Sequence, residues 1–232
     1  PDTLRLVKSI SPPLPSRDGR SSRWDQHRQE RRLTLVRAAR AAVHELGPAA
    51  SMDEIAAHAG TSKSVYYRYF GDRAGLRVAV AERVTAHMER RLLEAAVDHS
   101  DAAATLHRMV EVYLSVAATS PNVYAFAVSA PDSSGAAAGV LDAFFDRVHA
   151  LLAEGLAQHL GADGVPPVGS PLGLWPRAAV GLVRATAETW LRSPEDARPD
   201  AAELAASITG WLLHGLLGAP TSPVPILSLI HI

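Results

Sequence analysis

The chain has 232 residues, of which 47% are hydrophobic and 20% are charged, and its formal net charge is −1. This length is sufficient for one or two domains with a sizeable core, and the lack of cysteine excludes disulfides, thiolate nucleophiles and cysteine zinc sites. No apolar run reaches the roughly 18 residues of a membrane helix and no signal-peptide pattern opens the chain, so we expect a cytoplasmic protein with no membrane partner.

The charges are distributed unevenly along the chain. Residues 1–77 hold 14 Arg and Lys against 8 Asp and Glu, a balance of +6, whereas the remainder has a balance of −7. A basic front and an acidic rear suit a protein that presents one end to phosphate groups. An incidental asymmetry is the alternative interpretation.

Residues 1–22 are expected to form a disordered basic arm. They combine several prolines and serines with little periodicity, which is typical of disorder. The arginines of this arm suit contact with a DNA groove, and a solvated tail is the alternative.

Residues 23–71 are expected to form a helix-turn-helix domain. Its first helix is predicted from Trp24 to Leu46 and ends at Gly47-Pro48, because these residues stop a helix. The apolar positions that recur at three- and four-residue intervals are Leu33, Val36, Ala39 (or Arg40), Val43 and Leu46.

Two short helices follow around a tight turn at Ala59 and Gly60. Ser51 and Glu54 have the spacing of a capping box at the start of the first. Ser62 can cap the second, which extends to about Tyr69. In a helix-turn-helix the second of these helices enters the major groove of DNA, so this layout predicts DNA binding.

Residues 72–220 are predicted to form a second, purely helical domain. The expected helices are 72–96, 102–118, 122–129, 136–160, 172–192 and 200–217, and the first has a buried stripe at Leu76, Val80, Val84, Met88 and Leu92. The fold class is therefore all-α, with about nine helices. The tail 221–232 has no assigned role.

Two motifs resemble the N-terminal domain of the TetR family of transcriptional regulators. They are L-x-x-V-R-A-A-R-x-x-V-H-E-L-G at 33–47 and S-M-x-E-I-A-x-x-A-G-T-S-K-S-V-Y-Y-R-Y-F-G-D-R-A-G-L at 51–76. The resemblance implies a bacterial DNA-binding regulator that acts as a homodimer. The C-terminal helices are compatible with this family, which varies widely there.

The resemblance also implies DNA-contact residues. Ser51 matches a hydroxyl that caps a helix and touches a phosphate, and Tyr67 matches a tyrosine that contacts the DNA backbone. The start of the recognition helix matches Thr61, Ser62, Lys63 and Ser64. Tyr69 stands where a histidine is usual and Arg73 where a lysine is usual, and Arg73 is expected to bind phosphate as a bidentate fork.

Elementary physics agrees with this assignment. The N-terminus of the recognition helix offers free N–H groups and a partial positive charge, which suit phosphate. Lys63 is the side chain at this end that is long enough to reach guanine acceptors. Tyr66 is interpreted as core, with DNA contact as the alternative.

An enzyme and a plain DNA-binding protein are the competing interpretations. The sequence lacks Gly-rich phosphate loops, H-E-x-x-H and G-x-S-x-G motifs, and its ten histidines are dispersed, so we expect no catalytic residue, cofactor or metal. About 150 residues follow the DNA-binding part, which favours a sensor domain over a protein without an effector. A cavity in the C-terminal bundle would discriminate between the two.

The sensor domain is expected to bind an apolar or amphipathic small-molecule effector. The candidate lining combines methionine and aromatic surface with few charges, at Met88, Leu92, Met109, Tyr113, Tyr124, Phe126, Phe144 and Trp175. The expected mechanism is a repressor that binds a palindromic double-stranded operator and is released by the effector, with helix 72–96 transmitting the change. Activation stays open, because the sequence does not show where the operator lies.

The last two helices, 172–192 and 200–217, are expected to form a four-helix dimer interface. One stripe comprises Leu174, Ala178, Gly181, Leu182 and Ala185, with Trp190 and Leu191 near its end. The other comprises Leu204, Ile208, Trp211, Leu212 and Leu216. The alternative is that both stripes belong to the core of one subunit.

Overall fold

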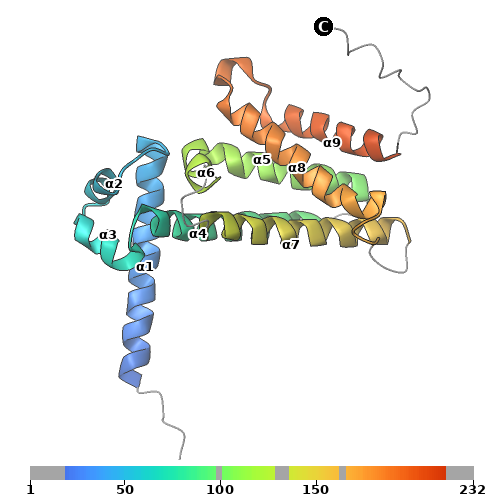
Figure 1. Ribbon diagram of the computed structural model, residues 1–232. Coiled ribbons are helices and arrows are strands. Elements are labelled where there is room, and N and C mark those ends of the chain that lie inside the picture. The colour runs from blue at the N-terminus through green and yellow to red at the C-terminus, as the bar shows by residue number, and fades with distance from the viewer. Residues whose placement is uncertain (1–18, 98–100, 129–135, 162–165, 218–232) are drawn as a thin grey trace, which may run out of the picture.

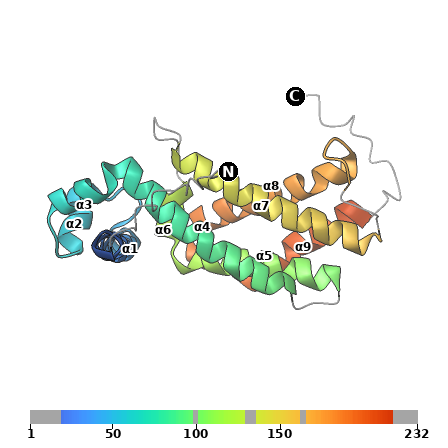
Figure 2. The same cartoon turned by 90° about the horizontal axis from the view of Figure 1, so that it is seen from below.

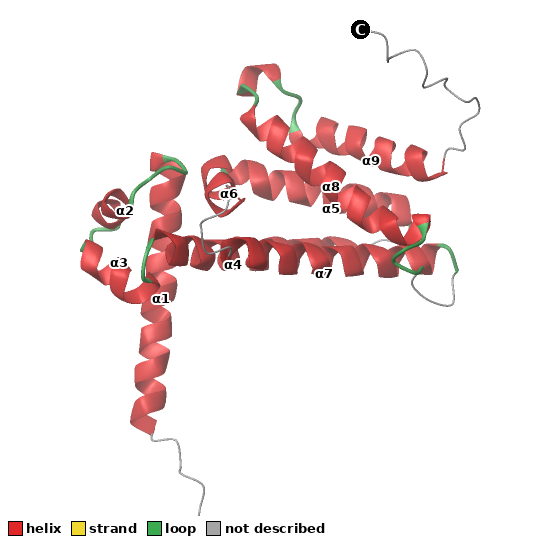
Figure 3. Cartoon of the chain, in the orientation of Figure 1, coloured by secondary structure: helices red, strands yellow, loops and turns green. Residues whose placement is uncertain are grey.

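The computed structural model describes residues 19–97, 101–128, 136–161 and 166–217, with the side chains of 23–97, 101–128, 136–161 and 166–213. Within these ranges the chain is all-helical (Figures 1 and 3), as predicted. The α-helices are α1 (Gly19–Leu46), α2 (Met52–His58), α3 (Lys63–Phe70), α4 (Arg73–Val97), α5 (Ala102–Thr119), α6 (Pro121–Val128), α7 (Ala136–His159), α8 (Pro171–Arg192) and α9 (Ala201–Leu217). A 3-10 turn, Glu195–Ala197, precedes α9.

The N-terminal core is formed by α1, α2, α3 and the start of α4. Val36, Ala39 and Ile55 are fully buried there beside Tyr66. The Tyr66 hydroxyl donates to the carbonyl of Leu35 at 3.0 Å, and burial raises its pKa to about 12, so the phenol stays neutral. Tyr66 is thus a core residue.

Two of the recurring apolar positions of α1, at the two ends of the series, are not buried. Leu33 and Leu46 are 43% and 49% exposed. Leu33 lies where α1 leaves the packed core, and Leu46 is the last residue of the helix. Leu35 and Ala42 are buried in the same core.

Helix α1 is also longer than predicted. It begins at Gly19, so the last four residues of the expected arm 1–22 are helical, whereas residues 1–18 lie outside the described part, as does the tail 221–232. Its N-terminal half projects away from the other helices (Figure 1).

Helix α4 belongs to two cores. Leu76 and Val80 pack in the N-terminal core, while Met88 and Leu92 pack in a second core with α5, α7, α8 and α9. Seen from below, α4 runs from beside α3 into this bundle (Figure 2). No helix in the described ranges is long and apolar enough to cross a membrane.

Helix α6 lies at the junction of the two cores. Val123 and Phe126 belong to the N-terminal core and Tyr124 to the second. The Asn122 side-chain amide donates to the carbonyl of His44 at 2.8 Å, which ties α6 to the end of α1. Helix α6 is therefore a second element, besides α4, that contacts both cores.

Candidate DNA-binding surface and effector cavity

The capping box predicted at the start of α2 is present. The Ser51 hydroxyl oxygen accepts from the Glu54 backbone N–H at 3.3 Å, and the Glu54 carboxylate accepts from the Ser51 backbone N–H at 2.8 Å. The turn that follows is made by Gly60, whose φ of +62° lies in the left-handed region. These local features fix the angle between α2 and α3.

The predicted contact residues at the start of α3 share one surface. Ser62, Lys63, Ser64 and Tyr67 are all exposed, and Thr61 is half-buried beside them. Ser62 is the N-cap residue, but its side chain makes no capping hydrogen bond, so that part of the prediction was wrong. The hydroxyl and the first-turn N–H groups face outward, an arrangement that suits an anion.

Lys63 is held by an acidic residue from α2. Its ammonium lies 2.6 Å from the Asp53 carboxylate and 5.7 Å from the centre of the Tyr67 ring. The hydrogen bond to Asp53 raises the pKa of Lys63, so the side chain is charged at neutral pH. Lys63 and Tyr67 thus form one cationic-aromatic unit on the exposed face.

Arg73 does not present the free bidentate fork that the sequence suggested. Its Nε donates to the carbonyl of Ala50 at 3.1 Å and its Nη2 to that of Pro48 at 2.7 Å. The guanidinium also lies 5.2 Å from the centre of the Phe126 ring. Because both carbonyls belong to the turn before α2, the Arg73 side chain links this turn to α4 and α6.

Tyr69 also differs from the expectation that it faces DNA with the start of α3. It is half-buried, with its ring centre 6.4 Å from that of Phe70 and the Arg68 guanidinium 5.4 Å away. Tyr69 lies two residues beyond Tyr67, on the side of α3 that faces α1. It lines a cleft with α1 instead of the exposed face.

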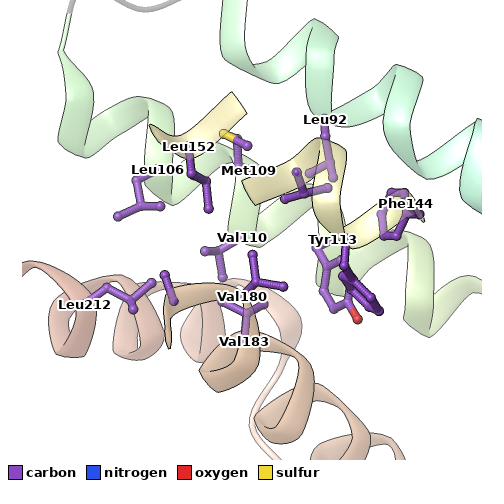
Figure 4. A pocket seen from close by; sticks show the side chains of 13 residues that line it. Leu92, Leu106, Met109, Val110, Tyr113, Phe144, Leu152, Val180, Val183 and Leu212 are labelled. Carbon is purple, nitrogen blue, oxygen red and sulfur yellow. The ribbon is translucent and has the colours of Figure 1, made fainter. Parts of the chain in front are cut away.

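The C-terminal bundle contains a partly open apolar cavity of about 50 Å³ (Figure 4). It is lined by Leu92, Leu106, Met109, Val110, Tyr113, Phe144, Phe145, Val148, Leu152, Ala179, Val180, Val183 and Leu212. Four of the eight residues predicted from the sequence are among them: Leu92, Met109, Tyr113 and Phe144. The lining residues from α8, Ala179, Val180 and Val183, were not predicted. Phe145, Val148 and Leu152 of α7 were not predicted either, although their three- and four-residue spacing was an available signal.

The other four predicted lining residues lie elsewhere. Met88 is packed in the second core and Trp175 lies against it, partly buried. Tyr124 is behind Tyr113, to which it is hydrogen-bonded. Phe126 belongs to the N-terminal core, since it lies on the other side of α6.

A pair of buried phenols lies beside the cavity, and Tyr113 is the member of the pair that lines it. The hydroxyls of Tyr113 and Tyr124 are 2.8 Å apart and their rings meet edge to face. Burial raises the pKa of both phenols, so both are neutral hydrogen-bonding groups. The cavity therefore offers almost purely apolar surface, and the hydroxyl of Tyr113 is bonded to that of Tyr124.

The same bundle has an open cleft on its outer side, between α7 and α8. Phe145 and Val180 line both the cavity and this cleft. Arg184 lies over the Phe145 ring at 5.1 Å and donates to Glu188 at 2.9 Å, and Arg177 is 3.4 Å from Asp146. Two side chains thus separate the apolar interior from a charged opening.

The two stripes predicted for dimerisation differ in their exposure to solvent. On α8, Leu174, Ala178, Gly181 and Ala185 are all exposed. On α9, Leu204, Ile208 and Leu212 are buried within the subunit, so that stripe was assigned wrongly, and the side chain of Leu216 lies outside the described ones. Trp211 is 54% exposed. Trp190 is buried and its indole N–H donates to the carbonyl of Pro199 at 2.8 Å.

Among the described residues no three His, Asp or Glu side chains assemble into a group that could hold a metal ion.

Comparison with known proteins identifies the N-terminal part. The family described as bacterial regulatory proteins, tetR family, matches residues 35–80. An uncharacterized HTH-type transcriptional regulator of Mycobacterium tuberculosis is 31% identical over 207 residues, which cover 87% of this chain and 85% of the relative.

Solved structures share the whole fold. FadR from Bacillus subtilis, in complex with stearoyl-CoA, superposes with a TM-score of 0.63 at 19% identity and covers 79% of this chain and 98% of its own. FadR from Thermus thermophilus, in complex with lauroyl-CoA, has a TM-score of 0.59 at 20% identity and covers 84% and 98%. The chain belongs to the TetR family of bacterial regulatory proteins and is a helix-turn-helix transcriptional regulator, not an enzyme.

Proposed function

We propose that this protein is a ligand-responsive repressor that binds a palindromic operator as a homodimer in the cytoplasm and is released by an amphipathic effector. One observation carries the proposal: the exposed face of α3 that holds Lys63 and Tyr67 and an apolar cavity in the C-terminal bundle are joined by α4 and α6. The cavity favours a sensor over a DNA-binding protein without an effector.

The exposed start of α3 supplies the DNA contacts. Ser62 and Ser64 are short enough to let the backbone approach the major groove, and Lys63 reaches toward guanine acceptors or phosphate. Lys63 must leave Asp53 to do so. The ion pair therefore keeps the Lys63 ammonium at the surface, where Asp53 competes with DNA for it.

Neutralising Asp53 is therefore expected to strengthen DNA binding. Asp53→Asn frees Lys63 and removes a negative charge near phosphate, whereas Lys63→Ala removes the contact. Each phosphate contact contributes about 0.9 to the slope of log K against log salt, so we expect changes on the order of tenfold in opposite directions at moderate salt. Gel shifts on a duplex selected by the wild-type chain measure this.

Asp196→Asn is the matched control, because this exposed aspartate lies in the turn before α9. Affinity that is unchanged in both Asp53→Asn and Lys63→Ala would remove this end of α3 from the interface.

The exposed face of α8 is the proposed centre of the dimer. Leu174, Ala178, Gly181 and Ala185 recur at four- and three-residue intervals, and small side chains let two helices approach closely. Trp211 on α9 adds exposed aromatic surface. Two copies joined in this way form an isologous interface, which matches a palindromic operator.

Gly181→Lys is expected to dissociate the dimer. A Cβ atom at Gly181 would meet no atom within 4 Å in the subunit, so we expect the fold to tolerate a side chain there, but a lysine would stand between two α8 helices. Sedimentation should show a monomer at micromolar concentration for this variant and a dimer for the wild type. Gly155→Lys on α7 is the control, since it has equal space and the same gain in helix propensity. A Gly181→Lys dimer as stable as the wild type would contradict the assignment.

The size of the cavity explains why an effector would change the structure. About 50 Å³ holds little more than a water or two, whereas small-molecule sites occupy roughly 300–1,000 Å³. An effector must therefore push α7 and α8 away from α4 and α5. An ion pair between Arg147 of α7 and Glu89 of α4, 2.7 Å apart, joins these two helices. A displacement of α7 therefore acts on α4 directly.

The chemistry of the cavity indicates the class of effector. Its lining is apolar, and Phe145 and Val180 separate it from a cleft that carries Arg177 and Arg184. A molecule with a hydrocarbon chain inside and a polar head in the cleft fits both. The stearoyl-CoA and lauroyl-CoA complexes of the two FadR proteins support an acyl chain.

Transmission to DNA runs through α4 and α6. Arg73 contacts both the Phe126 ring and the turn that precedes α2. A displacement of α4 or α6 therefore moves the helix-turn-helix, and two subunits that rotate in opposite senses no longer match successive major grooves. Repression follows if the operator overlaps a promoter, and activation if it lies upstream.

Titration of the DNA-bound protein with acyl compounds tests the proposal. Long-chain acyl-CoA should quench or enhance tryptophan fluorescence and release the duplex over the same concentration range. Free coenzyme A tests whether the polar head alone releases DNA, and a long-chain alcohol tests whether the hydrocarbon chain alone does. If small charged metabolites release DNA and acyl compounds do not, the effector assignment is wrong.

A further inference from the structure

The cleft between α1 and α3 contains an aromatic and cationic lining that the helix-turn-helix does not require. Trp24, Asp25, His27 and Arg28 from α1 face Arg68 and Tyr69 from α3 across a volume of about 430 Å³. Trp24 is 75% exposed. The cleft lies beside the recognition helix and outside the face formed by Ser62, Lys63, Ser64 and Tyr67.

The projecting part of α1 adds little to the core. Residues 23–34 contribute no buried side chain, although the Arg32 guanidinium lies 5.5 Å from the centre of the Phe70 ring and 3.6 Å from the Glu82 carboxylate. A helical segment whose side chains are mostly exposed gains little from packing and is marginal in isolation. A large exposed tryptophan at its end therefore indicates a partner.

The charge of this segment identifies the partner as polyanionic. Residues 23–32 hold four arginines against Asp25 and Glu30, and Arg68 adds a further positive charge from α3. Asp25 is the acidic side chain in the lining of the cleft, opposed by Arg28 and Arg68. Guanidinium groups that flank aromatic rings are suited to a sugar-phosphate backbone.

The direction of α1 indicates which DNA it meets. Its N-terminal half points away from α8 and α9 (Figure 1). If α8 forms the centre of the dimer, the two α1 extensions point outward along the duplex. They then lie over the sequence that flanks the operator half-sites, beyond the bases that α3 faces.

We propose that the α1–α3 cleft binds the phosphate backbone of the DNA that flanks each operator half-site. This inference rests on the proposed dimeric DNA-binding mode. Arg28 and Arg68 contact phosphates, and Trp24 packs on the sugar edge of the minor groove. The contacts add affinity and salt dependence without adding base specificity.

The test uses the full chain and a duplex selected by the wild type from a randomised pool. Binding is measured on this duplex with long flanks and on versions whose flanks are trimmed stepwise to the protected half-sites. Arg28→Ala with Arg68→Ala should lower the slope of log K against log salt by about 0.9 per lost phosphate contact on the long duplex. On the trimmed duplex the variant and the wild type should bind equally.

Asp25→Asn provides a gain that misfolding cannot mimic. It removes the acidic group from the cleft and should raise affinity severalfold on the long duplex and leave the trimmed duplex unaffected. Arg108→Ala, an exposed arginine on α5, is the control and should change neither.

The outcomes separate the two proposals. If the wild type selects no duplex, the proposed DNA-binding mode fails. If it selects one and the cleft variants weaken both duplexes equally, or neither, the cleft does not contact the flank. Binding of the cleft to an acidic protein segment, with no dependence on flank length, would also overturn the proposal.

Discussion

Replacing Phe126 by alanine is expected to have the largest effect on stability. The ring is 1% exposed, and the guanidinium groups of Arg73 and Arg77 lie 5.2 and 5.7 Å from its centre. Deleting a buried phenylalanine side chain typically lowers the free energy of unfolding by about 3–5 kcal/mol. The ring comes from α6 and packs in the N-terminal core. Its removal therefore weakens the packing of α6 against that core.

Denaturation followed by circular dichroism measures this effect. Phe126→Leu keeps most of the volume and should cost less than about 1.5 kcal/mol. Val97→Ala is the control, since Val97 is on the surface and a change there stays within about 0.5 kcal/mol. In the Leu variant, we expect effector binding to persist while DNA release weakens. A full response in that variant would place the coupling in α4 alone.

Filling the cavity is expected to have the largest effect on sensing. Ala179 is fully buried and lines the cavity of about 50 Å³. Ala179→Leu adds three carbon atoms where an acyl chain would enter, so effector affinity should fall by at least about tenfold, the lower end of the 1–3 kcal/mol of a single methylene group. Overpacking should lower stability by about 1–3 kcal/mol. DNA affinity without effector should also fall, because the added side chain pushes the same helices apart as an effector would.

Fluorescence titration and gel shift on the same samples separate the two properties. Ala150→Leu adds the same three carbons on the exposed side of α7 and should alter neither. If Ala179→Leu responds to the effector as the wild type does, the effector binds elsewhere, and the cleft between α7 and α8 becomes the site to examine by the same approach.

The parts of the molecule that local chemistry defines were predictable. The capping box of Ser51 and Glu54 spans three residues, and the turn at Gly60 needs a left-handed backbone that glycine adopts readily. The helices of the bundle follow from the spacing of apolar residues. Their boundaries agree with prediction within a few residues, except at the start of α1, where arginines and serines show no periodicity to detect.

The exposure of the candidate contact residues was predictable from the motif, whereas the lining of the cavity was predicted less completely. Lys63 and Tyr67 are exposed together at the start of α3, as the motif implied. The ion pair with Asp53 was not predicted, since it joins two helices through a turn. Half of the eight predicted lining residues do line the cavity, because methionine and aromatic side chains are easily noticed, whereas Val180 and Val183 look like ordinary packing.

The sequence by itself determined the helices, the helix-turn-helix and the family, because caps, turns and periodicity act over a few residues. The tertiary structure alone decided which partner each face meets. It assigned Arg73 to carbonyls 23 and 25 residues away, Phe126 to the N-terminal core and Tyr124, two residues earlier, to the other. It also buried most of the α9 stripe within the subunit. Periodicity identifies the apolar side of a helix but does not specify what covers it, since that depends on contacts between segments far apart in the chain.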